Sequence, residues 1–303
     1  MKNFLVLILL FTVLNSHAYA EQPAAEKYHQ MFQSGNFYVE CQIFTFQNSR
    51  KMPTAFLVYA GKDGKRMHGL NRSGVLGWYP AYGVTELTTS SNREMLKFRE
   101  TLEAASKKYP HVLYENGRYY RFYKPLKKQD YSFRDELRGV MLPEEKLNSP
   151  NLNPDEEWQY VQSDLALPDE LVIFFWDDKF HKNPLGLKPY YNGSSKVTVD
   201  KKEYDCDQYL IDLKSMAGTN IAQEAYNALY ENGQLVIVRK YLIYKGKERF
   251  VRDLKVIAIT EQVPEEAFAF SKKIKVYEAG TGNIDDLVGD PKVIGEVGGK
   301  VTK

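Results

Sequence analysis

The side chains in this chain best suited to chemistry are its histidines, but they are not spaced as a ligand set. His29, His68, His111 and His181 stand far apart. None has a second histidine or a cysteine at the short spacing that zinc sites use. We therefore expect no zinc site and no other cofactor.

Other catalytic patterns are equally weak. Asp205 and Asp207 lie on one face of an expected strand, where they could bind a cation or simply face solvent. No G-x-S-x-G turn is present to expose a nucleophilic serine. Gly299-Lys300 is followed by Val301, where a phosphate-binding loop needs a hydroxyl. We expect a protein that is not an enzyme; carboxylates that meet only in the fold, as in glycoside hydrolases, are the catalytic alternative.

The two cysteines, Cys41 and Cys206, both fall on expected strands. In an oxidising compartment a disulfide between them would join the first strand to the middle of the chain. Two buried free thiols that pack as small apolar side chains are the alternative. The sequence leaves both open.

The first 20 residues have the pattern of a secretory signal peptide. Lys2 precedes an apolar run from Phe4 to Leu14, and Ala18-Tyr19-Ala20 forms a small-x-small cleavage site. This run of 11 residues is too short to span a bilayer, which takes about 20. We expect export to the periplasm or cell envelope, or outside the cell, and no transmembrane segment in the mature chain.

The charge and the aromatic content of the chain indicate which kinds of partner to expect. Of the 303 residues, 283 remain after cleavage at residue 20, with 40 basic and 39 acidic side chains. No persistent basic face is evident, so a nucleic-acid partner is not expected. The 22 tyrosines and 16 phenylalanines favour strands and apolar surfaces that stay partly wet.

Two predicted β-hairpin turns are the clearest structural signals in the chain. Asn116-Gly117 and Asn232-Gly233 are strong two-residue turn signals, and each follows an identical Leu-Tyr-Glu. This repeat indicates either a duplicated sheet unit or convergent turn chemistry. Residues 204–268 read as consecutive strands. Residues 221–229 also show helical spacing, but the Asn232-Gly233 turn needs a strand on each side.

These patterns predict an α+β fold that is mainly β, a curved antiparallel sheet or incomplete barrel with a few covering helices. Helices are expected at residues 21–35 and 91–109. One domain would span residues 21–279, with an irregular proline-rich insertion at about 142–168. Residues 280–303 would form a flexible tail.

The order of elements resembles the bacterial outer-membrane lipoprotein carrier (LolA-like) superfamily, which includes periplasmic envelope-stress regulators. The resemblance rests on the signal peptide, the first helix, the opening strand Gly35-Asn-Phe-Tyr-Val-Glu-Cys-Gln-Ile43, and the closing strand and exit loop at residues 254–268. It implies an incomplete antiparallel barrel with helices over its open side, holding acyl chains or a protein partner. The proline-rich insertion and the tail depart from that layout.

Two functions follow as expectations. The first is an exported binding protein whose concave sheet holds a lipid, a lipoprotein acyl chain or a similar apolar ligand. The second is an envelope interaction or scaffold protein with a filled core that binds a protein or glycan through a tyrosine-rich surface. For the first, eight apolar side chains are expected to form the ligand-binding wall: Phe37, Val39, Ile43, Phe56, Val58, Val236, Val238 and Leu242.

Overall fold

The structure is a computed structural model of the whole chain. It describes residues 24–47, 50–71, 112–123, 138–144, 162, 164–181, 187–213, 221–268, 273–278 and 292–298. The helix predicted at 91–109 and most of the proline-rich insertion lie outside these ranges. Within them, one α-helix, α2 (Glu26–Ser34), and one 3-10 turn, η4 (Glu265–Phe268), accompany the strands. The expectation of a few covering helices was therefore an overestimate for this part of the chain.

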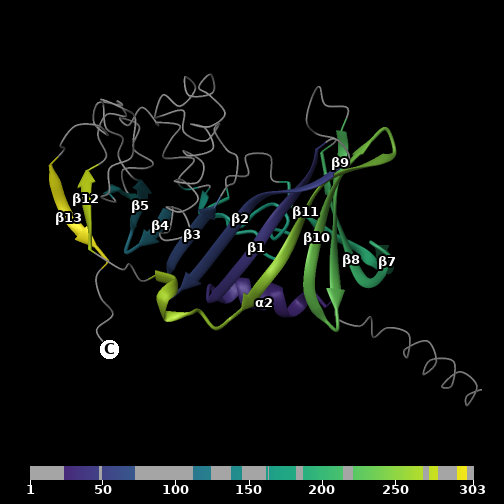
Figure 1. Cartoon of the computed structure of the whole chain (residues 1–303), viewed down its shortest axis with the longest axis horizontal. Coiled ribbons are helices and arrows are strands. Elements are labelled where there is room, and N and C mark those ends of the chain that lie inside the picture. Colours follow the sequence, from purple (N-terminus) through teal and green to yellow (C-terminus); the bar gives the residue numbers. More distant parts are fainter. Residues whose placement is uncertain are drawn as a thin grey trace, which may run out of the picture.

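The described strands form a single open sheet in the order β13-β12-β6-β5-β4-β3-β2-β1-β11-β10-β9-β8-β7. Neighbours are antiparallel except β6 and β12, which are parallel. Figure 1 shows the long central strands running side by side, with α2 alongside them. The strands are β1 (Phe37–Gln47), β2 (Arg50–Lys62), β3 (Lys65–Asn71), β4 (Val112–Glu115), β5 (Arg118–Tyr123), β6 (Arg138–Pro143), β7 (Tyr190–Val199), β8 (Lys202–Asp212), β9 (Ile221–Glu231), β10 (Gln234–Tyr244), β11 (Lys247–Thr260), β12 (Ile274–Glu278) and β13 (Val293–Val297).

The predicted hairpins are confirmed. Asn116-Gly117 joins β4 to β5 and Asn232-Gly233 joins β9 to β10, with positive φ at all four residues. Residues 221–231 form a strand, so the helical alternative is wrong there. Part of the tail expected to be flexible, Val293–Val297, instead forms β13 against β12, because its β-branched residues favour a strand.

The largest apolar cluster covers one face of the central sheet, which we call the helix face. α2 supplies Tyr28, Met31 and Phe32, and Gly35 ends this predicted helix in the left-handed conformation. The backbone N–H of Leu235 on β10 donates to the Tyr28 hydroxyl at 2.7 Å. This bond ties the helix to the sheet. A second cluster of β2, β3, β4, β5 and β12 side chains forms separately.

A segment without strand or helix structure packs on the helix face beside α2. We call residues 167–175 the plug segment. Leu167, Leu171, Ile173 and Phe174 of this segment are buried in the helix-face cluster. Its backbone forms local hydrogen bonds, such as Leu171 N–H to the Pro168 carbonyl at 2.7 Å. The plug segment is therefore held by its side chains rather than by the ladder of the sheet.

Candidate functional site

The predicted apolar wall is divided between faces. Phe37, Val39 and Val238 are fully buried in the helix-face cluster, and Ile43 packs against it. Strand alternation places Leu242 on the same face as Val238. These five residues are brought to one surface.

The other three wall residues do not join them. Val58 packs with the second cluster, on the opposite side of β2 from Leu57 and Tyr59. Phe56 precedes it by two positions on β2, and its side chain is not among those that the structure describes. Val236 sits at a bulge between β9 and β10 and packs in a separate cluster. A bulge shifts strand alternation, which the sequence pattern did not reveal.

Cys41 and Cys206 are both free and buried. Cys41 lies in the helix-face cluster, whereas Cys206 packs with Val199 and Leu229 in another. Their strands, β1 and β8, are separated by β11, β10 and β9, which is too far for a bridge that needs Cα atoms within about 7 Å. Of the two alternatives, the geometry fits free thiols, and burial raises the pKa of Cys206 to about 11.

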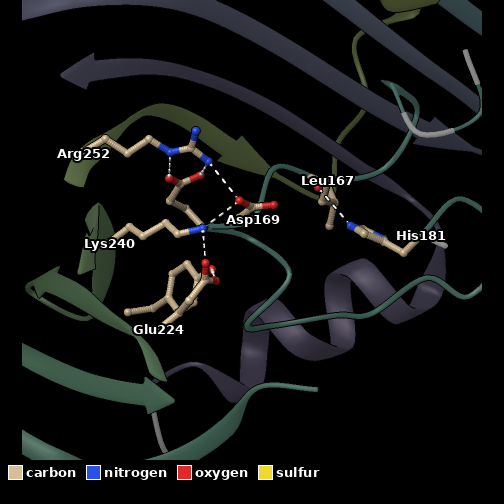
Figure 2. Close-up of polar contacts among 8 residues, drawn as sticks. Leu167, Asp169, His181, Glu224, Lys240 and Arg252 are labelled. Carbon is tan, nitrogen blue, oxygen red and sulfur yellow. Dashed lines mark hydrogen bonds and ion pairs between the residues drawn. The ribbon is translucent and has the colours of Figure 1, made fainter. Parts of the chain in front are cut away.

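An ionic cluster lies where the plug segment crosses β10 and β11 (Figure 2). Arg252 of β11 binds both carboxylate oxygens of Glu170 and reaches Asp169 Oδ2 at 3.2 Å. Lys240 of β10 lies 2.9 Å from Asp169 Oδ2 and 3.0 Å from Glu224 Oε1. Two cations thus meet three carboxylates, two of which belong to the plug segment.

Burial controls the electrostatics of this cluster. Burial raises the pKa of Glu170, and the guanidinium of Arg252 offsets part of that effect. Burial alone would lower the pKa of Lys240, but the carboxylates of Asp169 and Glu224 outweigh it and raise that pKa. Lys240 therefore remains charged although it is buried, and Arg252 remains charged with its side chain 29% exposed.

Both ends of the plug segment are also anchored by side chains. His29 of α2 contacts the Phe174 carbonyl at 2.5 Å, and His181 Nε2 lies 3.1 Å from the Leu167 carbonyl (Figure 2 shows the second contact). Just beyond the segment, Arg66 of β3 pairs with Asp177 at 2.6 Å. Two of the four histidines singled out in the sequence, His29 and His181, thus contact backbone carbonyls.

Sequence reasoning missed this cluster because its partners are far apart in the chain. Lys240 and Asp169 are separated by 71 positions, and Arg252 and Glu170 by 82. The sequence did contain one indication of this ionic cluster. Arg239-Lys240 interrupts a strand that is apolar on both sides of it, and Asp169-Glu170 immediately precedes the apolar run at 171–176. Charges embedded in apolar stretches indicate buried pairing.

Among the described residues, no group of three or more His, Cys, Asp or Glu side chains is placed to hold a metal ion. None of the described helices is long and apolar enough to cross a membrane.

Comparison with known proteins adds little. No protein-family model matches the chain, and no curated protein matches it. Among solved structures, a DUF1329 family protein from Desulfovibrio piger is similar to 81% of this chain over 93% of its own, with 12% identity and a TM-score of 0.25. That score is too low to support an argument about fold or function, so the lipoprotein-carrier resemblance stays a prediction.

Proposed function

We propose that this protein is an exported, non-enzymatic binding protein whose helix face takes up an apolar chain, such as a lipid or the acyl group of a lipoprotein, in place of the plug segment. The observation that carries this is the plug segment itself. It fills the helix face with apolar side chains yet contributes no strand to the sheet.

The free energy gained by burying an acyl chain is comparable to that gained by burying the plug segment. Burying an apolar side chain contributes about 1.5–3 kcal/mol, so Leu167, Leu171, Ile173 and Phe174 together contribute roughly 6–12 kcal/mol. An acyl chain gains about 0.8 kcal/mol for each buried methylene, so about 8 to 15 methylenes would match that. A long-chain lipid could therefore compete with the plug segment, and a short one could not.

The direct test is uptake of a fatty-acyl probe by delipidated protein, together with mass spectrometry of natively purified protein. We expect a co-purified lipid and binding of long-chain probes. Phe174→Ala weakens the plug segment and should tighten probe binding several-fold. Phe122→Ala is the matched control, because Phe122 is similarly buried but lies in the second cluster.

The control separates competition from general loosening. If both variants bind more probe, the gain reflects lost stability rather than release of the helix face. If wild type and Phe174→Ala both fail to bind any acyl probe, the proposal is wrong.

One observation supports the alternative that the protein is an interaction or scaffold protein. Tyr190 and Tyr191 on the edge strand β7 are 43% and 46% exposed, and Tyr244 on β10 is 40% exposed. Exposed tyrosines suit a protein or glycan surface, because the ring packs while the hydroxyl stays hydrated. This alternative gains if the protein binds no acyl probe and substitution of Tyr190 and Tyr191 abolishes capture of an envelope partner.

A further inference from the structure

Lys240 and Arg252 stand directly opposite each other on neighbouring strands. They are paired in the register of β10 and β11, and both side chains point to the helix face. Like charges opposite one another destabilise a sheet unless an anion lies between them. Here Asp169 and Glu170 of the plug segment supply that anion. The sheet itself supplies one carboxylate, Glu224 of β9, so the cationic pair keeps one positive charge for a negatively charged occupant to balance.

We propose that Lys240 and Arg252 form a head-group site, and that the natural ligand of the helix face is an anionic amphiphile with a carboxylate or phosphate head and an apolar tail. The proposal rests on the proposed function and names the class of ligand. The plug segment has the same chemistry, since two carboxylates precede the buried Leu171, Ile173 and Phe174.

Charge balance gives the site its selectivity. With the plug segment in place, two cations and three carboxylates carry a formal charge of −1. Removing Asp169 and Glu170 leaves Lys240, Arg252 and Glu224, with a formal charge of +1. An anionic head restores neutrality, whereas a neutral head leaves the partly buried Arg252 unpaired and a cationic head adds repulsion.

Geometry assigns the main role to Arg252. Within the described part of the chain its ion-pair partners are Asp169 and Glu170, and both belong to the plug segment. Lys240 also pairs with Glu224, whose other oxygen accepts a hydrogen bond from the Tyr226 hydroxyl. Release of the plug segment therefore frees the guanidinium fork, which suits two oxygens of a carboxylate or phosphate.

The test compares four ligands with one tail. Delipidated protein is titrated with dodecanoate, dodecyl phosphate, dodecanol and dodecyltrimethylammonium below their micelle concentrations. We expect the two anions to bind about 10- to 100-fold more tightly than dodecanol, and the ammonium most weakly. The ratio of dodecanoate to dodecyl phosphate distinguishes a fatty-acid source from a phospholipid source.

Variants locate the preference. Lys240→Gln and Arg252→Gln should bring the affinities for dodecanoate and dodecanol close together. Arg239→Gln is the matched control, because Arg239 makes a similar pair with Asp253 between the same two strands. It should leave the ratio unchanged. Since Arg252→Gln strands the buried Glu170 and risks unfolding, Glu170→Gln provides a second measurement and should tighten dodecanoate binding several-fold.

The outcomes separate the two proposals. Equal affinity of wild type for dodecanoate and dodecanol overturns the head-group site and leaves apolar binding intact. The head-group site is overturned in the same way if Lys240→Gln keeps the full anion preference, or if Glu170→Gln weakens dodecanoate binding. If none of the four amphiphiles binds to wild type or to Glu170→Gln, the proposed function and this inference both fail.

Discussion

Glu170 is the residue whose protonation should report most directly on how the plug segment is held. It is fully buried, and burial raises its pKa. In an unfolded chain a glutamate titrates near about 4.3. Because the folded state binds this proton more tightly, Glu170 contributes stability that is complete below about pH 4.3 and is lost as the pH rises through its folded-state pKa.

Replacing Glu170 with glutamine removes this pH-dependent contribution. We expect the free energy of unfolding of wild type, minus that of Glu170→Gln, to fall as the pH rises from about 4 through the folded-state pKa of Glu170. Urea denaturation of both proteins at a series of pH values measures this difference. Two parallel pH profiles would show that Glu170 has the same proton affinity in the folded and unfolded chains.

At the scale of single residues, the sequence predicted local roles better than distant ones. It placed Phe37, Val39 and Val238 on a common surface, because strand alternation is a local pattern. It could not assign Asp169 and Glu170 as partners of Lys240 and Arg252, since these two carboxylates lie in a segment outside the sheet. It also could not place Val236, where a bulge interrupts the alternation.

Among the elements, the β9–β10 hairpin depends on a turn that few residues can make. Gly233 has a φ of 72°, and a side chain there costs about 1–2 kcal/mol. We expect Gly233→Ala to lower the free energy of unfolding by that amount, as measured by chemical denaturation. Gly295→Ala on β13 is the control, because an added Cβ there meets nothing within 4 Å and needs no positive φ.

The hairpins were predictable because the information in a turn is local. Asn-Gly between β-branched or aromatic runs defines the turn, and both such sites form as expected. What covers the sheet was harder to predict. The plug segment has neither helical nor strand periodicity, and its place follows only from its fit to a surface made by six strands. Non-local packing of this kind leaves no periodic trace in the sequence.

For the whole molecule, the predicted signal peptide gives a sharp, testable boundary. The sequence places cleavage after Ala20, and the helix-face cluster begins at Ala25, which is buried. A chain starting at Glu21 therefore keeps Tyr28, Met31 and Phe32 of α2. If the predicted signal peptide is removed, the mature protein should have the mass of residues 21–303, as measured by intact mass spectrometry.

The stability of the protein should depend strongly on whether α2 is present. A chain starting at Glu21 should unfold at the same denaturant concentration as the full sequence, because it keeps every α2 side chain of the helix-face cluster. A chain starting at Gly35 loses three large buried side chains, worth about 5–9 kcal/mol. That loss is comparable to the whole stability of a typical domain, about 5–15 kcal/mol. The shorter chain should therefore unfold far more easily or fail to fold, and equal stability of the two would show that α2 is not part of the core.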